Sequence, residues 1–251
     1  MLNKKDIVVF YTKAKLENDI FNNYIGFLWW LLDPVLSAVV YYVVFDLILR
    51  RGGPDYIMYL FVGIVVWKWF QTTIKSGSAS ILNNKNLYKK VYLPKIVFPW
   101  IEINFASFKF IFAIVFIAVL YPLLGFPLTL NYLYLPISFF ALFVFMLGIS
   151  TLLAALVPFI PDINLVIAHL LRLLFYPSGI LFRPNQVPDR LQFVLTYNPI
   201  AQGVKAFRDI LMYGEAPSTF GIFFLIGLGL ATYFIGVILI KKFEGKYAKL
   251  A

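Results

Sequence analysis

Six apolar runs, each long enough to cross a lipid bilayer, constrain this sequence more than any other feature. A membrane-spanning helix needs about 20 mostly apolar residues. The runs cover residues 27–49, 56–74, 100–124, 133–157, 163–182 and 219–240. Only 14% of the residues are charged, whereas soluble proteins are about 25% charged. We therefore expect an all-α polytopic membrane protein with six transmembrane helices, folded as a single domain over residues 1–251.

The lysines and arginines outside these runs predict how the chain is oriented. Positively charged residues favour cytoplasmic loops, and most of them fall in cytoplasmic segments if the N-terminus is inside. Both termini are therefore expected in the cytosol, with residues 241–251 as a cytoplasmic tail. The net charge of +10 comes from lysines and arginines that we expect to orient the chain and to face anionic lipid headgroups. We do not interpret it as a sign of nucleic-acid binding. These features predict a multi-pass protein of a bacterial inner membrane.

The sequence offers few groups for metal or nucleotide chemistry. It has no cysteine and a single histidine, His169, so we expect no disulfide, no metal site and no bound cofactor. The phosphate-binding pattern G-x-x-x-x-G-K-[ST] is also missing, because EGKYA near the C-terminus lacks both the earlier glycine and the hydroxyl residue. We therefore do not expect this chain to hydrolyse ATP or to be an enzyme.

Two segments predicted to be cytoplasmic have helical patterns of their own. Residues 1–25 form an amphipathic interface helix, with Ile7, Phe10 and Phe21 on one face. This helix is either a membrane-surface anchor or a docking surface for a cytosolic partner. Residues 74–95 contain a second short helix, which Ser78 or Ser80 is predicted to cap. That segment is either a positively charged anchor or a contact for a motor subunit.

Residues 183–218 are predicted to form a re-entrant helical hairpin on the outer side, before the last span. A crossing here would place the C-terminal lysines outside, and the segment is too short for one. One short helix starts at Pro188. The second is capped by Asn198, begins with Pro199 and ends at Gly214. Four apolar residues should face the bundle or lipid, namely Ile200, Val204, Phe207 and Leu211. Three polar residues, Gln202, Lys205 and Asp209, should face water, and we expect the hairpin, which also includes Arg208, to act as a flexible lid.

Three stretches resemble the membrane subunit of ABC-2 type exporters for O-antigen and related cell-surface polysaccharides. They read NNYIGFLWWLLDPVLSAVVYYVVF (22–45), YLFVGIVVWKWFQTTIKSGSASILNNKNLYKKVYLPKIVFP (59–99) and LFRPNQVPDRLQFVLTYNPIAQGVKAFRD (181–209). The resemblance implies a homodimeric permease with its channel between two copies. Two copies of a separate ATPase subunit would bind ATP and Mg²⁺, and the cargo would be a glycan linked to lipid through a diphosphate. It does not separate O-antigen from teichoic acid, capsule or another glycan.

The resemblance also implies which residues contact the ATPase. In the family, the N-terminal helix and the segment between the second and third spans perform this role. The residues implied are Phe10, Lys13, Ser78, Ser80, Asn84, Leu87, Tyr88, Lys89 and Lys90.

A glycan path needs aromatic faces for sugar rings and cations for the diphosphate. In the first span Asp33, Ser37, Tyr41 and Phe45 recur at every fourth residue, with Tyr42 beside them. In the fifth span four residues interrupt the apolar run: His169, Arg172, Tyr176 and Ser178. These two sets are the predicted path. The five tryptophans, Trp29, Trp30, Trp67, Trp69 and Trp100, are expected mainly in the interfacial belt.

Arg172 lies deep in its span and should face a partner or water. Asp33 has a similar depth, so one hypothesis is that the two pair, within a subunit or across a dimer, and close the path. Arg172 could instead pair with Glu102 to hold the bundle, or bind the incoming diphosphate.

Two other classes of membrane protein are weaker interpretations. An embedded transferase acting on lipid-linked sugars needs a positioned acid–base pair, but the acidic residues inside the spans are scattered. A proton-coupled carrier with inverted repeats should show internal symmetry, and the sequence shows none.

Overall fold

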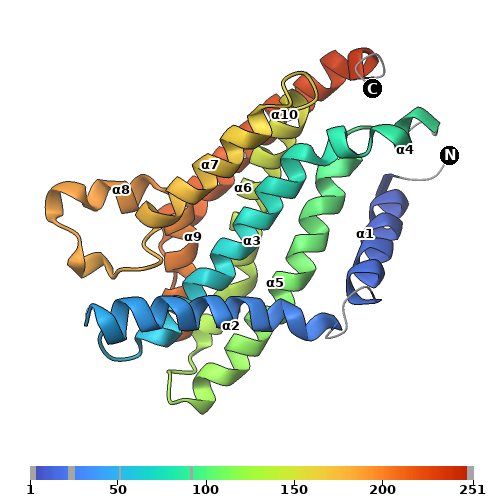
Figure 1. The fold of residues 1–251 in the computed structure, drawn as a ribbon. Helices are drawn as coiled ribbons and strands as arrows, with labels where there is room; N and C mark the ends of the chain where they lie inside the picture. The colour runs from blue at the N-terminus through green and yellow to red at the C-terminus, as the bar shows by residue number, and fades with distance from the viewer. Residues whose placement is uncertain (1–3, 22–25, 51, 91–92, 248–251) are drawn as a thin grey trace.

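The computed structural model describes residues 4–21, 26–50, 52–90 and 93–247, with the side chains of residues 89 and 90 excepted. Within these ranges every regular element is a helix (Figure 1). The all-α polytopic fold predicted from the sequence is therefore confirmed.

Five helical segments are long and apolar enough to cross a membrane. The first, Gly26–Ile48, comprises η1 (Gly26–Leu28), α2 (Trp29–Tyr42) and the π-helical η2 (Val43–Ile48). The fourth, Leu130–Leu156, comprises η3 (Leu130–Tyr134) and α6 (Leu135–Leu156). The other three are α3 (Tyr56–Asn83), α5 (Val97–Leu123) and α10 (Thr219–Tyr247). The first, third, fourth and sixth predicted runs are thus found close to their expected positions.

The fifth predicted run forms a shorter helix than expected. α7 (Ile163–Phe175) continues as the 3₁₀ turn η4 (Tyr176–Ser178), and Gly179 then adopts a left-handed conformation with φ of 66°. Its 16 helical residues would span about 24 Å if fully α-helical. The helix stops before residue 182 because Pro177 and Gly179 both favour its end.

The central helix of the bundle is α3, which packs against α2, α5, α6, α7 and α9 (Figure 1). It continues past the predicted boundary at residue 74, and a turn at Asn84 separates it from the short α4 (Lys85–Lys90). Ser78 and Ser80 therefore lie inside α3, where their hydroxyls donate to the carbonyls of Lys75 and Gly77. The prediction that one of them caps a separate helix is wrong, because the stretch contains no residue that breaks the helix.

Two of the five tryptophans belong to the core and not to the interfacial belt. Trp67 and Trp69 are buried on α3. The ring of Trp69 stacks between Phe110 of α5 and Phe139 of α6, with centroids 4.0 and 5.0 Å away. The belt expectation is wrong for these two residues, because α3 is surrounded by other helices and does not meet the lipid at those positions.

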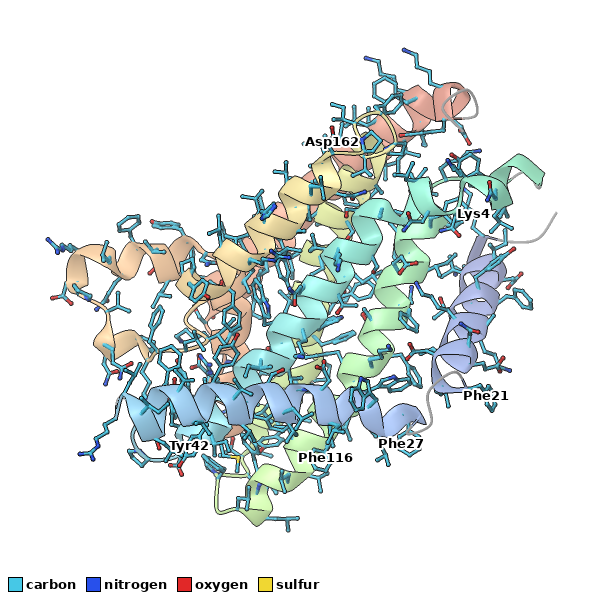
Figure 2. The ribbon with its side chains drawn as sticks, viewed as in Figure 1. Lys4, Phe21, Phe27, Tyr42, Phe116 and Asp162 are labelled. Atoms are coloured by element: carbon cyan, nitrogen blue, oxygen red, sulfur yellow. The ribbon has the colours of Figure 1, made fainter. Side chains whose placement is uncertain are left out.

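The first helix and the last one meet at the same end of the bundle. A cluster of buried side chains joins Ile7 of α1 (Lys4–Phe21), Ile81 of α3, Tyr88 of α4, Val97 of α5 and Tyr247 of α10. In Figure 2, Lys4 lies beside α4, whereas Tyr42, the last residue of α2, lies far from it. This common end gathers the segments that the sequence predicts to be cytoplasmic.

The hairpin region contains η5 (Pro184–Gln186), η6 (Asp189–Leu191), α8 (Gln192–Tyr197), α9 (Pro199–Arg208) and η7 (Asp209–Tyr213). The Asn198 side chain accepts hydrogen bonds from the Ile200 and Ala201 amides, and Gly214 ends η7 with φ of 65°. The predicted cap, first-turn proline and end of this helix are confirmed. The first short helix starts later than predicted, at Gln192, because Pro188 precedes a 3₁₀ turn.

α6 and α10 form the most extensive helix pair, and glycines bring their backbones close together. A Cβ atom on Gly229 of α10 would lie 2.6 Å from the Phe145 backbone, and one on Gly236 would lie 2.7 Å from the Leu152 amide nitrogen. A Cβ on Gly148 of α6 would collide with the Gly229 carbonyl. This α6–α10 seam follows the general rule that small residues let membrane helices approach each other.

We predict that Gly229→Ala destabilises the protein by about 1–3 kcal/mol, because the new methyl group must push α6 away. The matched control is Gly227→Ala on the same helix, where a Cβ atom meets nothing within 4 Å. The measurement is thermal unfolding of both variants in detergent. Equal stability of the two variants would contradict the close packing at the seam.

Candidate functional site

One stripe of α3 remains uncovered, and it is polar. Between Tyr59 and Ile81 every residue of the helix is buried except six. Those six are Lys68, Gln71, Thr72, Lys75, Ser76 and Ala79. They recur every three or four residues, so they lie on one face of the helix. We call this set the α3 stripe. A polar stripe on an otherwise apolar helix indicates contact with water or with a polar ligand.

Two adjoining cavities follow the stripe and together form the α3 groove. The one nearer the α4 end has a volume of about 660 Å³ and is lined by Lys75, Ser76 and Asn83 of α3 and Asn164 of α7. The deeper cavity has a volume of about 320 Å³. Both include Gln71, so the groove is continuous between α3 and α7, and α2 borders its deep end.

The deep cavity brings together several predicted path residues from two different spans. Ser37 and Tyr41 of α2 line it with Arg172 and Tyr176 from the end of α7. From α3 it also contains Lys68 and Gln71, which the sequence analysis did not include. The signal for them was present, because Lys68 and Gln71 are polar residues three positions apart inside the apolar run 56–74.

Other predicted path residues lie elsewhere. Tyr42 and Phe45 are partly buried against the main core. His169 is exposed on α7 and lines neither cavity. Ser178 is buried, donates to the Leu174 carbonyl, and accepts from the Asn198 amide at 3.2 Å. Ser178 therefore anchors the hairpin and does not line the groove, which corrects its predicted role.

Asp33 pairs with Lys68 and not with Arg172. Its carboxylate lies 2.5 Å from the Lys68 ammonium on the facing side of α3. The hypothesis of an Asp33–Arg172 pair within one subunit is therefore wrong. The reason is that α2 packs against α3, which places Lys68 opposite Asp33.

Glu102 does not pair with Arg172 either. Its carboxylate contacts Lys15 of α1 at 2.5 Å, and a second ion pair joins Asp19 of α1 to Lys109 of α5 at 2.7 Å. The indole of Trp30 also donates to Asp19. The charges of α5 therefore hold α1 against the bundle. In the part of the chain that the structure describes, Arg172 has no hydrogen bond or ion pair.

The hairpin helix α9 is inserted into the bundle. The four predicted inward residues, Ile200, Val204, Phe207 and Leu211, are all buried. Gln202 and Asp209, predicted to face water, are buried as well, whereas the Lys205 side chain is half-exposed. Gln202 donates to the Leu195 and Thr196 carbonyls, and Asp209 binds Lys205 at 2.6 Å. Gln202 therefore holds α8 against α9, and the burial of α9 contradicts the flexible-lid prediction for this helix.

Arg208 fixes α9 to the bundle. Its guanidinium is buried and stacks on the Tyr59 ring at 3.3 Å. It donates to the carbonyls of Tyr59, Gly179 and Ile180 at 2.7–3.2 Å. Burial lowers the pKa of Arg208, whereas burial raises the pKa of the neighbouring Asp209 carboxyl. The Gly179 and Ile180 carbonyls follow the end of η4, where a helix leaves carbonyls without intrahelical partners, whereas the Tyr59 carbonyl belongs to the first turn of α3.

The predicted ATPase-contact residues divide into two groups. Phe10 is exposed on α1, and the Lys13 side chain is exposed beside Glu17 at 3.8 Å. Asn84 and Leu87 are partly exposed near α4. Ser78, Ser80 and Tyr88 are buried, so their side chains do not form part of a docking surface. The side chains of Lys89 and Lys90 lie outside the described residues.

The fold and the groove define a multi-pass membrane subunit suited to transport. A family model described as ABC-2 type transporter matches residues 9–212, and the chain belongs to this family. The family predicted from the sequence is confirmed, and its membrane subunits are transport permeases and not themselves enzymes.

Three relatives illustrate the similarity. The chain is 26% identical over 246 residues to the O-antigen export system permease protein RfbA of Klebsiella pneumoniae, a match covering 98% of this chain and 95% of the relative. It is 24% identical to RfbA of Myxococcus xanthus, covering 85% and 83%. It is 25% identical to the polysialic acid transport protein KpsM of Escherichia coli, covering 88% and 86%.

We predict that reversing either charge of the Asp33–Lys68 pair reduces transport, and that the double variant Asp33→Lys/Lys68→Asp restores part of it. The opposite charges would then face each other again across α2 and α3. The coupling energy expected for a partly exposed pair is about 1 kcal/mol. The measurement is glycan appearing at the cell surface. As a control, Lys68→Asp is combined with Asp46→Lys at the far end of the first span; rescue by this pair would contradict a specific contact.

Proposed function

We propose that this chain is the permease subunit of an ATP-driven exporter that moves a lipid-linked polysaccharide of the O-antigen class across the inner membrane. The observation that carries the proposal is the α3 groove, a polar surface between α3 and α7 in a bundle of membrane-spanning helices. The relative RfbA is named for O-antigen export, and the relative KpsM is named for polysialic acid transport. Both names refer to a glycan cargo, which supports the proposed substrate class. Capsule, teichoic acid and other polyol phosphates are the alternative cargoes.

A second copy of the chain would close the groove. The first span is mostly exposed, including Leu36, Val40 and Val44 of its α2 and η2 parts. An apolar surface of this kind suits either lipid or another subunit. If two copies face each other, two α3 stripes line one path. We therefore propose a homodimer with its channel between the copies.

Aromatic side chains in the groove suit a sliding glycan. Tyr176 is exposed, and Tyr41 contacts Phe175 with ring centroids 5.4 Å apart. Such rings stack on the apolar faces of sugars, and many weak contacts allow a chain to move without being trapped. Because α9 is held in place by Arg208, only α8 and the loop before it remain to shape the exit.

The energy source in this proposal is a separate ATPase, present in two copies, which binds ATP and Mg²⁺. The docking surface would be the end of the bundle where α1 and α4 meet. Phe10 and Lys13 lie there on the free side of α1, while Lys15 and Asp19 hold its other side to α5. Movement of the ATPase would therefore pull on α5 through two ion pairs.

We predict that the purified permease and its partner ATPase copurify, and that lipid-linked glycan stimulates ATP hydrolysis by the complex. Lys13→Glu should weaken this association and lower the stimulated rate several-fold, because it reverses an exposed charge at the docking surface. The control is Arg190→Glu in the exposed loop before α8. The proposal would be refuted if glycan did not change the rate of ATP hydrolysis and Lys13→Glu changed neither this rate nor the association of the subunits.

Orientation gives a second prediction. The chain lacks cysteine, so single cysteines can be introduced for labelling without background. A membrane-impermeant maleimide should label Asn185→Cys in the hairpin of intact spheroplasts, whereas Lys246→Cys should react only after lysis. The reverse result would place the termini outside and overturn the direction of transport.

A further inference from the structure

The deep end of the α3 groove contains two cationic side chains, of which only one is paired with a carboxylate. Lys68 and Arg172 both line the cavity of about 320 Å³. Lys68 is neutralised by Asp33, whereas Arg172 has no bonded partner in the described part of the chain. The cavity therefore has an uncompensated positive charge within the membrane-spanning region.

Such a charge is costly unless a ligand or water meets it. An arginine at the centre of a membrane helix costs about 2.5–3.5 kcal/mol on insertion scales. Its planar guanidinium matches phosphate oxygens with two parallel hydrogen bonds. Ser37, Gln71 and Tyr176 add neutral hydrogen-bonding groups around the same cavity. This set of donors suits an anion with several oxygen atoms.

The polarity of the groove changes along α3. From Asn83 to Lys68 the residues that are not buried are polar apart from Ala79 and Leu82. Beyond Lys68, the α3 residues that line the deep cavity are Ile64 and Trp67, and no charged residue follows on that face. An anion that enters from the α4 end therefore meets polar groups as far as Lys68 and Arg172 and stops there.

The two helices that border this cavity carry exposed apolar side chains. Val40 on α2 and Leu170, Leu173 and Leu174 on α7 are exposed around the two helices that border it. A ligand with a phosphate head and a hydrocarbon tail could place the head in the cavity and the tail on these side chains. A soluble anion would leave them uncovered.

We propose that the Lys68–Arg172 cavity binds the diphosphate of a polyprenyl-linked glycan. The cavity holds the linkage at the depth where the polar stripe ends, with the sugar chain directed along the groove. This assignment rests on the proposed export function and names the site where the lipid end of the substrate is recognised.

Binding of farnesyl diphosphate to the purified full-length permease tests the site. Tryptophan fluorescence is a suitable signal because Trp67 lines the cavity. We expect affinity in the order farnesyl diphosphate, farnesyl monophosphate, farnesol. Arg172→Gln and Lys68→Gln should each weaken farnesyl diphosphate binding about 10-fold or more. Two variants are used so that the result does not depend on the folding of either one.

Three controls separate the possible sources of an anion signal. Arg190→Gln removes an exposed arginine outside the cavity and should bind as the unmodified protein does. Inorganic pyrophosphate tests the head without a tail, and phosphatidylglycerol tests an ordinary lipid phosphate; both should bind at least about 10-fold more weakly.

Equal binding by Arg172→Gln, or equal affinity for phosphatidylglycerol, would overturn the assignment. Either result would leave the copurification with an ATPase unaffected, so failure of this site and failure of the export function are distinguishable.

Discussion

The buried guanidinium of Arg208 organises the outer half of this protein. A helix end inserted in a membrane bundle leaves carbonyl groups that water cannot reach, and each one needs a donor. Arg208 donates to two such carbonyls, of Gly179 and Ile180, and also to the Tyr59 carbonyl, which is more than 100 residues away in sequence, while the Tyr59 ring covers its face. Gly63 leaves the space, because a Cβ there would collide with the guanidinium. The short α7 and the inserted α9 depend on this one side chain.

The fixed α9 borders a polar cavity of about 260 Å³ at its own end of the bundle, and the α3 stripe forms a separate polar surface toward the other end. The α3 stripe begins at Lys68 and continues toward α4, where α1 is attached through Lys15 and Asp19. The predicted glycan path and the predicted ATPase contact are thus carried by neighbouring elements. The ion pair between Asp33 and Lys68 joins the first span to α3 at the deep end of the groove.

Much of the fold could be predicted from the sequence, because apolar runs and helix caps are local features. Five of the six runs, the Asn198 cap and the Gly214 end are examples. The site was predicted only in part. Ser37, Tyr41, Arg172 and Tyr176 line one cavity, but Asp33 pairs with Lys68 and Glu102 with Lys15, and neither pairs with Arg172. Which charges pair depends on which helices are neighbours, and residue depth alone does not determine that. Arg208 was placed on an exposed hairpin for the same reason, because its carbonyl partners come from distant segments.

The glycine contacts between α6 and α10 have a mechanical consequence. Two backbones in direct contact cannot slide or separate without losing van der Waals contact along several turns. α6 and α10 should therefore move together as one rigid unit. The first span, held by an ion pair, and the short α7 are then the elements that can move. Any widening of the protein during a transport cycle would then occur on the side of the molecule away from the seam.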